Sequence, residues 1–514
     1  MQLRAVCAVV CLAFATLLSS QTAPGSSGTR SDEADVVRQK LLIRSYLLSK
    51  DFSLEERGVY LGYASRATRL GFEDDLRRLW SEELFQVTLQ VAPSGTRMAM
   101  QEAAVITLAP LDPERALELL TAADPLTSIP PGTMPEDVRV DACSTLFPEL
   151  WKRKGMASLA AIRTVAQRIG ETGEYPYSAV QAIVEDLAKL NSEEALSLIS
   201  EAFSFYRRGS KVLSADGHFV DFLIASHKLM PSAITREAIL FTASELSEKA
   251  AKGSPSKYRS QVHTERGVAE FDNPADRVLF ELVPTIREVD PALAERLVRD
   301  RPALGLASKV DGPMDVGEGV LLRGSAAGSD DSRLLRRGLA ESRLQRIRQM
   351  APAKPDEALR LALDLNDPDL RSTALGYVAA GFAPKDVQRA QAILRQARSA
   401  RDSVHDPPAR LHSIVADAMA AAALRNVADL RRSVKEGLEL GTEVFQEDQD
   451  AHPTKPAINT AGFHDLRELA RISARIDPEG TVAQVTAMEN HLLQAYLLLS
   501  VAEGLREAGA HAAQ

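Results

Sequence analysis

Histidine and cysteine, which most often bind metals or act as bases and nucleophiles, are scarce in this chain of 514 residues. It has nine histidines and no H-E-x-x-H motif, and its two neighbouring cysteines, Cys7 and Cys11, lie inside an apolar run. His405 and His412 are seven residues apart, but Pro407 and Pro408 lie between them and should interrupt a shared helix face. We interpret both histidines as solvated loop or cap residues and predict no metal site.

Acidic residues cluster at Glu73–Asp75 and at Asp330–Asp331. The first cluster precedes an apolar helical pattern, where carboxylates stabilise the positive end of the helix dipole. Neither cluster completes the D-D-x-x-D motif of all-α prenyl-diphosphate enzymes, because positions 78 and 334 are Arg78 and Leu334. A structural interpretation is preferred for the first cluster, and neither matches that enzyme motif.

Nucleotide loops and nucleophile motifs are also missing. Gly317 and Gly319 belong to no G-x-G-x-x-G or G-K-S/T motif and follow no predicted strand, and a G-x-S-x-G turn is absent. Cys143 lies on the apolar face of VRVDACSTLF, which indicates a buried structural residue; a reactive thiol or an intermolecular bridge is the alternative. We predict no catalytic and no cofactor-binding residues, and no cofactor.

Aromatic side chains form the remaining candidate binding features. They are Phe203, Phe205 and Tyr206 beside Arg207 and Arg208, then Tyr175 and Tyr177, then Phe219 and Phe222. Packing between helices explains such clusters, whereas an exposed aromatic–arginine patch would serve as an anchor for a partner.

The N-terminus has the order of a secretory signal peptide. Arg4 precedes an apolar run from Ala5 to Leu18, followed by small and polar residues. The run is 14 residues long, whereas a membrane-spanning helix needs about 20. We expect cleavage after Ser20, export to the periplasm or the extracellular space, and no permanent membrane span afterwards. Only Cys143 would remain, so no disulfide would form within the chain.

Composition favours a folded, helical chain. It is 45% hydrophobic and 25% charged, with 5% aromatic residues, and alanine-rich, aromatic-poor chains suit close helix packing better than sheets. The net charge of -9 argues against nucleic-acid binding, which depends on clustered Lys and Arg.

A helix-start pattern recurs four times, with Pro or Ser followed by Ala three residues later and Leu three beyond. The stretches are DPERALELL from Asp112, NSEEALSLI from Asn191, DPALAERLV from Asp290 and KPDEALRLA from Lys354. Asp and Asn are good N-caps and proline is tolerated at the first helical position. The fourth start depends on proline alone because lysine is a poor cap.

The C-terminal region contains weak internal repeats. Pro355–Phe382 aligns with Pro478–Leu505 at a shift of 123 residues, and a shift of 39 aligns Asp367 and Pro368 with Asp406 and Pro407. Alanine and glycine replace the bulky residues expected on one face of residues 367–383, which predicts a close approach between neighbouring helices. A helix pair of roughly 35–40 residues would explain these patterns.

These features resemble the α-solenoid class of tetratricopeptide and HEAT-like repeats, well over Glu357–Ala508 and loosely over Ala34–Ala250. The tetratricopeptide pattern itself is not met, since Leu61–Ala67 (LGYASRA) carries only a fragment of it. The resemblance implies stacked antiparallel helix pairs with an extended surface for a partner, and no ligand-binding residues can be carried over.

We therefore predict an all-α protein: an α-solenoid in two blocks joined by a glycine-rich, partly flexible middle segment. The expected organisation is a signal peptide (1–20), a disordered tail (21–31), an N-terminal helical-repeat block (32–250), an irregular linker (251–332) with a helical island (274–299), a C-terminal helical-repeat block (333–508) and a tail (509–514).

The preferred function is that of an exported, non-enzymatic binding or scaffold module for a protein, peptide or cell-envelope partner. The alternatives are an all-α hydrolase or lyase of the envelope and a purely structural assembly unit. The identity of the ligand and the oligomeric state do not follow from the sequence.

Overall fold

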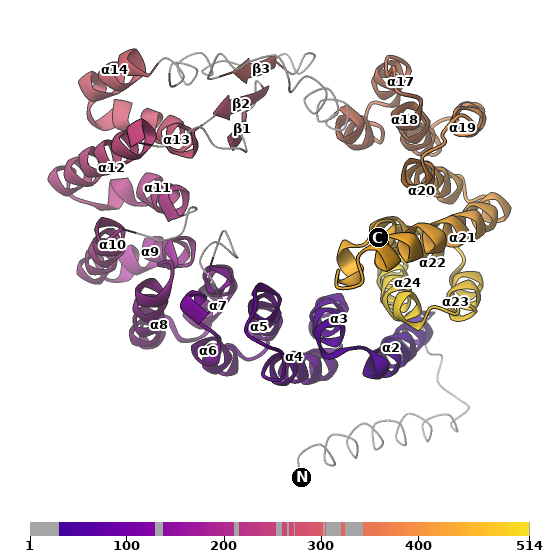
Figure 1. The fold of residues 1–514 in the computed structure, drawn as a ribbon, viewed down its shortest axis with the longest axis horizontal. Coiled ribbons are helices and arrows are strands. Elements are labelled where there is room, and N and C mark those ends of the chain that lie inside the picture. Colours follow the sequence, from indigo (N-terminus) through magenta and orange to yellow (C-terminus); the bar gives the residue numbers. More distant parts are fainter. Residues whose placement is uncertain are drawn as a thin grey trace, which may run out of the picture. The chain divides into compact units, whose positions relative to one another are not determined.

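The structure is a computed structural model that describes residues 30–128, 137–209, 215–252, 260–264, 267–271, 273–301, 304, 320–323 and 343–512. Helices dominate these residues and follow one another in packed pairs (Figure 1). The predicted all-α, solenoid-like fold class is confirmed. The expected signal peptide and most of the glycine-rich segment 303–332 lie outside the described residues.

The chain divides into two compact units, one formed by residues 51–340 and the other by the residues up to 50 together with those from 341 onwards. We call them the central unit and the terminal unit. Each unit has its own two rows of helices, and each is described by itself.

In the central unit, each odd-numbered helix contacts the next odd-numbered one and so forms one row. That row contains α3 (Leu54–Ala67), α5 (Gly95–Leu108), α7 (Val138–Lys154), α9 (Tyr177–Leu190), α11 (Ala215–Ser226) and α13 (Pro274–Val289). The even-numbered helices pack against this row and form the second layer. They are α4 (Asp74–Thr88), α6 (Pro113–Ala122), α8 (Leu159–Thr172), α10 (Ser192–Arg207), α12 (Ser232–Lys252) and α14 (Pro291–Asp300).

In the terminal unit, consecutive contacts join the even-numbered helices from α18 to α24 into an inner row. These helices are α18 (Pro368–Phe382), α20 (Pro407–Ala423), α22 (Phe463–Ala474) and α24 (His491–Ala512), and a helical segment at 343–350 precedes them. The outer layer contains α17 (Pro355–Leu363), α19 (Val387–Arg401), α21 (Val427–Ala451) and α23 (Pro478–Thr486). The alternation of inner and outer helices is the helix-pair repeat that the sequence predicted.

The predicted helix starts are confirmed at single-residue level. The side chains of Asp112, Asn191 and Asp290 accept hydrogen bonds from the backbone N–H groups three residues later, which have no partner within the helix. Lys354 makes no such bond, and Pro355 alone marks the start of α17. Local chemistry therefore decides where these helices begin.

Glycine allows the inner helices of the terminal unit to approach each other closely. A Cβ on Gly381 of α18 would lie 2.3 Å from the backbone oxygen of Ala351, and one on Gly376 would lie 2.7 Å from the Cβ of Ala416. Gly504 of α24, which is 123 residues beyond Gly381, would place a Cβ 2.3 Å from the backbone oxygen of Arg471. The repeat in the sequence is thus a repeat of backbone-to-backbone contacts.

The N-terminal helix α2 (Arg30–Leu48) packs against α24 and belongs to the terminal unit. The Arg38 Nε donates a hydrogen bond of 3.0 Å to the Ala502 carbonyl, and the Ser45 hydroxyl donates one of 2.6 Å to the Ala495 carbonyl. The sequence grouped this helix with the block 32–250 because contacts between residues more than 400 positions apart leave no local signal.

A small sheet lies in the stretch that the sequence described as an irregular linker. Strand β1 (Ser260–Thr264) pairs antiparallel with β2 (Gly267–Phe271), which pairs in parallel with β3 (Val320–Arg323). The expected helical island at 274–299 consists of two helices, α13 and α14, because Asp290 caps a new helix there. The last helix continues through Ala512, where the sequence predicted a tail from 509.

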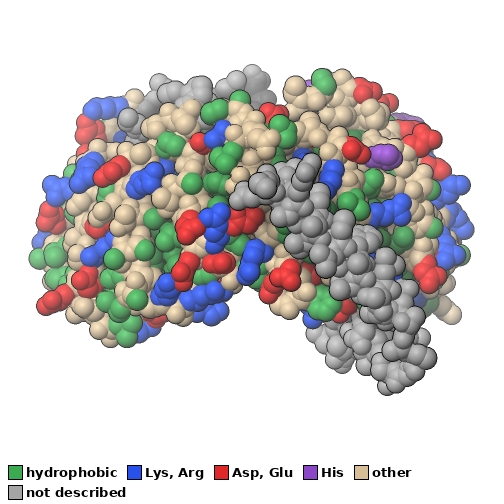
Figure 2. Space-filling model, turned by 90° about the horizontal axis from the view of Figure 1, so that it is seen from below, with side chains coloured by type: hydrophobic (Ala, Val, Ile, Leu, Met, Phe, Trp, Pro, Cys, Tyr) green, Lys and Arg blue, Asp and Glu red, His purple; other side chains and the backbone are tan. Residues whose placement is uncertain are grey.

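Short 3₁₀ helices join several of these elements. They are η1 (Ser49–Asp51), η2 (Leu126–Ser128), η3 (Gly155–Ser158), η4 (His227–Leu229) and η7 (Ala457–Asn459). None of the described helices combines the length and hydrophobicity that crossing a membrane requires. Positive and negative side chains are interspersed on the face shown in Figure 2.

Candidate functional site

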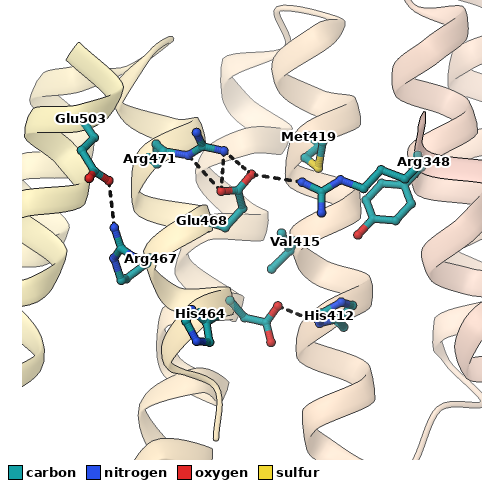
Figure 3. A pocket seen from close by; sticks show the side chains of 11 residues that line it. Arg348, His412, Val415, Met419, His464, Arg467, Glu468, Arg471 and Glu503 are labelled. Atoms are coloured by element: carbon teal, nitrogen blue, oxygen red, sulfur yellow. Dashed lines mark hydrogen bonds and ion pairs between the residues drawn. The ribbon is translucent and has the colours of Figure 1, made fainter. Parts of the chain in front are cut away.

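A groove runs along the inner row of the terminal unit. It consists of a first hollow of about 360 Å³, which Figure 3 shows, and a second hollow of about 330 Å³. Four residues line both: Arg348, Met419, Glu468 and Arg471. The first hollow is completed by Tyr377, His412, Val415, His464, Asp465, Arg467 and Glu503. The second is completed by Ala380, Ala422, Ala423, Ile472, Arg475 and Ile476. We call the two hollows together the inner groove.

Helical spacing brings these side chains to one surface. On α20 the groove residues His412, Val415, Met419 and Ala422 recur every three or four positions and so share one face. Other faces of the same helix bury Leu411, Ile414 and Ala418 in the core. The segment 343–350, α18, α22 with the two residues after it, and α24 contribute the remaining lining, so the stacking of inner helices forms the groove.

An ion-pair ladder crosses the inner groove. The Arg471 Nη2 lies 2.6 Å from the Glu468 Oε2, and its Nη1 lies 2.7 Å from the Glu507 Oε1. Arg467 donates a hydrogen bond of 2.9 Å to Glu503. The pairs with Glu507 and Glu503 hold α22 against α24, and together with the Glu468 pair they fix the positions of two guanidinium groups.

Arg348 is held more loosely than the other groove arginines. Its Nη2 lies 3.8 Å from the Glu468 Oε1, beyond hydrogen-bond distance, and its side chain is 41% exposed. The guanidinium also lies over the ring of Tyr377, 5.4 Å from the ring centre. Arg348 therefore presents a positive charge to whatever occupies the groove.

His412, labelled in Figure 3, and Asp465 form a second polar pair in the first hollow. The imidazole Nδ1 lies 2.8 Å from the carboxylate Oδ1, and this hydrogen bond raises the pKa of His412 above its ordinary value. Such a pair can exchange a proton. No serine, threonine, cysteine or lysine is among the residues that line the two hollows, so the pair has no adjacent hydroxyl, thiol or amine nucleophile of those types.

The interpretation of His412 as a loop or cap residue is wrong. Pro407 occupies the first position of α20, with Asp406 as the N-cap, so the two prolines begin the helix instead of interrupting it. His412 lies in the second turn and faces the groove, whereas His405 precedes the helix and is exposed. The structure does not bring the two histidines together as a site.

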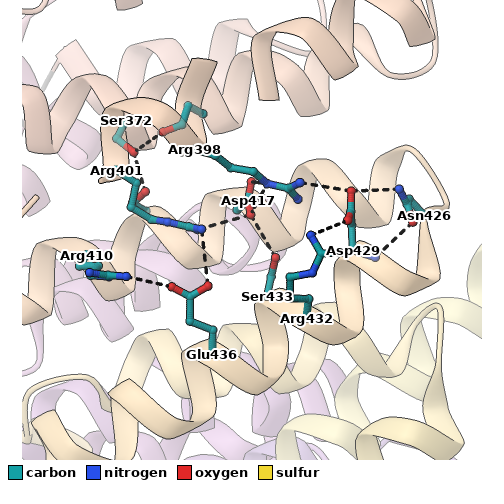
Figure 4. Close-up of polar contacts among 12 residues, drawn as sticks. Ser372, Arg398, Arg401, Arg410, Asp417, Asn426, Asp429, Arg432, Ser433 and Glu436 are labelled. Carbon is teal, nitrogen blue, oxygen red and sulfur yellow. Dashed lines mark hydrogen bonds and ion pairs between the residues drawn. The ribbon is translucent and has the colours of Figure 1, made fainter. Parts of the chain in front are cut away.

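A buried polar network supports the opposite side of α20 (Figure 4). The carboxylate of Asp417 is only 4% exposed and accepts hydrogen bonds from Arg398 Nε at 3.0 Å, from the Ser433 hydroxyl at 3.1 Å and from Arg401 Nη1 at 3.4 Å. Arg398 also reaches Asp429 on α21. The network connects α19, α20 and α21, so it positions the groove without lining it.

The aromatic residues that the sequence selected form a packed cluster in the central unit. Tyr206 stacks on Phe219 with ring centres 3.9 Å apart, and Tyr175 stacks on Phe205 at 4.8 Å. Tyr175, Tyr177, Tyr206, Phe219 and Phe222 are buried, while Phe203 and Phe205 are half-buried. Arg207 and Arg208 lie over Phe203 and Phe205, respectively. Packing between α9, α10 and α11 accounts for this cluster.

The other residues considered as chemistry-bearing have structural places. Cys143 is completely buried, and burial raises its pKa well above the ordinary value, so the buried structural interpretation is confirmed. Asp74 and Asp75 occupy the first turn of α4. Asp330 and Asp331 lie outside the described residues. Within the described ranges of the chain, no three or more His, Cys, Asp or Glu side chains form a group that could hold a metal ion.

Carboxylates along the odd-numbered row of the central unit differ from those in the groove. Burial and the negative charge of Asp141 raise the pKa of Glu102 to about 7, although Arg66 opposes the shift. Burial also raises the pKa of Asp221 and of Glu281. These acids experience partial burial that their neighbouring cations do not offset.

The groove residues Arg348, Glu468 and Arg471 were not singled out in the sequence. One signal was present: Arg348 and Arg471 are 123 residues apart, the same shift that aligns the two repeats. Two arginines at equivalent repeat positions indicate a shared inner face. Arg471 and Glu468 are three residues apart on α22, which is a local pair, whereas the approach of Arg348 to Glu468 depends on the stacking of the helices and has no local signature.

Comparison with known protein families, curated proteins and solved structures found no match to this chain.

Proposed function

We propose that this chain is an exported, non-enzymatic binding or scaffold protein whose inner groove holds a protein or peptide partner. The observation that carries the proposal is the continuity of the two hollows, which share Arg348, Met419, Glu468 and Arg471. A charged rim above an apolar floor suits recognition of an extended segment. Apart from the loosely held Arg348, the charged groups of the rim are paired with one another, which supports binding more than activation of a reacting group.

The proposal is tested by partner capture from the native host with three forms of the protein. Ala423 lies exposed at the second hollow, so Ala423→Trp fills some of the groove. Leu363→Trp on α17 places the same side chain at a position that is already 52% exposed and away from the groove. The unchanged protein and Leu363→Trp should capture the same envelope partner, and Ala423→Trp should lose it. Equal capture by all three forms would show that the partner does not bind in the inner groove.

Export is the second element of the proposal, and its support is the order of charged, apolar and small residues before Gln21. Mass spectrometry of fractionated host cells should find a mature form outside the cytoplasm that begins near Gln21. An intact Met1 on protein that remains in the cytoplasm would contradict export.

An envelope hydrolase or lyase is the second candidate, and the His412–Asp465 pair in the groove favours it. The pair could act as acid and base on a bound polymer. If so, turnover of envelope polymers should occur and should fall at least about 100-fold in both His412→Ala and Asp465→Asn. Turnover that survives in both variants would exclude this pair as the catalyst.

A further inference from the structure

The second hollow of the inner groove combines a cationic rim with an apolar floor. Three arginines and one carboxylate line it: Arg348, Arg471, Arg475 and Glu468. Its other lining residues are Ala380, Met419, Ala422, Ala423, Ile472 and Ile476. Because the whole chain carries a net charge of -9, this excess of guanidinium groups is a local feature of the groove.

Glu468 occupies the place that a ligand carboxylate would take. It accepts hydrogen bonds from Arg471 at 2.8 and 2.9 Å but lies 3.8 Å from Arg348. Among the residues that the structure describes, no hydrogen bond joins the Arg348 side chain to another residue, and the Arg475 side chain has one ion pair, of 3.4 Å to Glu507. The Glu468 carboxylate is therefore hydrogen-bonded to Arg471 but not to Arg348. A second carboxylate, supplied by a ligand, could form hydrogen bonds with Arg348.

We propose that the inner groove binds an acidic peptide segment, with a Glu or Asp carboxylate of the partner at Arg348 and a neighbouring apolar side chain on the floor formed by Met419 and Ile472. Arginine suits this role because its planar guanidinium binds a carboxylate through two parallel hydrogen bonds. This inference rests on the proposed function, since it names the chemistry of the partner that the groove would hold.

A peptide fits these observations better than a polyanion does. Long anionic polymers would be repelled by the net negative charge of the chain, whereas a short segment reaches only the local positive charge. The floor is apolar, so a partner that offers charge alone would leave Met419, Ile472 and Ile476 without contacts.

The test uses the full-length protein and three fluorescein-labelled peptides of equal length, in which leucine alternates with glutamate, glutamine or lysine. Fluorescence anisotropy should show that the glutamate peptide binds about tenfold more tightly than the glutamine peptide, and the lysine peptide should bind most weakly. Raising the salt concentration should weaken the binding of the glutamate peptide and should leave the binding of the uncharged glutamine peptide unchanged. Equal binding of the three peptides, or a preference for lysine, would overturn the inference.

Two substitutions should change the affinity for the glutamate peptide in opposite directions. Arg348→Gln removes the proposed carboxylate partner and should weaken binding about fivefold to tenfold. Glu468→Gln removes the competing internal carboxylate and should strengthen binding several-fold, a gain that loss of structure would not produce. Arg389→Gln is the matched control, because Arg389 is 43% exposed on α19 and pairs with Asp356 away from the groove. No change in Arg348→Gln, or a loss in Glu468→Gln, would contradict the proposal.

The outcomes separate this inference from the proposed function. If Ala423→Trp abolishes capture of the natural partner but the peptides show no preference for acid, only the acidic specificity fails. If polygalacturonate binds to the groove and the glutamate peptide does not, the partner is an anionic polymer and the inference is overturned. If Ala423→Trp changes neither capture nor peptide binding, both proposals fail.

Discussion

The two units build the same double row of helices from different side chains. In the terminal unit, glycine and alanine let inner helices meet backbone to backbone, as at Gly381 and Gly504. In the central unit, the rings of Tyr177, Tyr206 and Phe219 fill the space between α9, α10 and α11. Stacked helix pairs therefore tolerate either thin or thick interfaces, provided that each interface is filled to native density.

The charges on the inner surfaces differ as well. In the terminal unit they meet across helices in ion pairs, such as that of Arg471 on α22 with Glu507 on α24. In the central unit, Glu102 and Glu281 are carboxylates whose pKa values burial raises. Ion pairs therefore fix the positions of charged side chains in the terminal unit, whereas in the central unit the ionised form of these carboxylates destabilises the fold.

The largest expected effect is loss of the aromatic interface in the central unit. Phe219→Ala should lower the free energy of unfolding of that unit by about 3–5 kcal/mol, because it leaves a cavity beside Tyr206 and Tyr177. Hydrogen-exchange mass spectrometry should show lost protection in α9 to α11. Phe72→Ala, at a residue 48% exposed, is the control and should change little. A small effect of Phe219→Ala would mean that the cluster is not the core of its unit.

The buried network of the terminal unit should come next. Asp417→Ala leaves Arg398 and Arg401 without their shared carboxylate and should destabilise the terminal unit by about 3 kcal/mol. Urea unfolding followed by circular dichroism measures the change. Asp186→Ala breaks an exposed pair with Lys189 and should cost less than about 1 kcal/mol. Similar costs for both substitutions would refute the structural role of Asp417.

The thin interfaces of the terminal unit are tested by adding one methyl group. Gly381→Ala and Gly504→Ala should each destabilise the unit by about 1–3 kcal/mol, because the new Cβ would meet a backbone oxygen at 2.3 Å. Gly217→Ala on α11 meets nothing within 4 Å and should instead stabilise the central unit by about 0.5 kcal/mol. If all three substitutions stabilise, the interfaces are looser than described.

The smallest effect concerns pH and the carboxylates of the central unit. The pKa of Glu102 is about 7 in the folded protein against an ordinary value of 4.5, so the folded state keeps its proton over a range where the unfolded state loses it. Stability from this group is therefore unaffected below about pH 4.5, falls as the pH rises towards 7, and stays reduced above it.

Glu102→Gln should remove this dependence. After allowance for solvent screening, we expect a gain of about 1 kcal/mol at about pH 8 and none at about pH 4. Urea titrations at the two pH values measure both numbers. Equal gains at the two pH values would show that packing, and not titration, causes the effect.

Much of the fold was readable from short stretches. Helix starts were predicted from the N-cap residues Asp112, Asn191 and Asp290. Close contacts between helices were predicted from small residues such as Gly381 and Gly504. Strands β1 and β2 pair locally but lie beside and within a stretch whose polar, turn-rich composition indicated a loop. Strand β3 was missed because it pairs with a strand some fifty residues earlier, and the pattern near Val320 is short and flanked by glycine. Pairing between distant segments is invisible to a local pattern.

The candidate site was predicted far less well than the fold. The groove needs Arg348, Glu468 and Arg471 from two helices that are more than 100 residues apart, and His412 was misread because its prolines begin a helix. On an isolated helix, a residue that lines a groove looks like any other surface residue. It becomes part of a groove only when a second helix packs beside it.

The division between local and long-range information has a physical cause. N-caps, proline positions and the width of an apolar face act within one or two turns, so the residues themselves set the helices, their ends and the closeness of their packing. The partner of each helix depends on contacts such as that of α2 with α24, which joins residues more than 400 positions apart. Contacts between helices also bring Arg348 to Glu468, and the groove forms only where the inner helices stack.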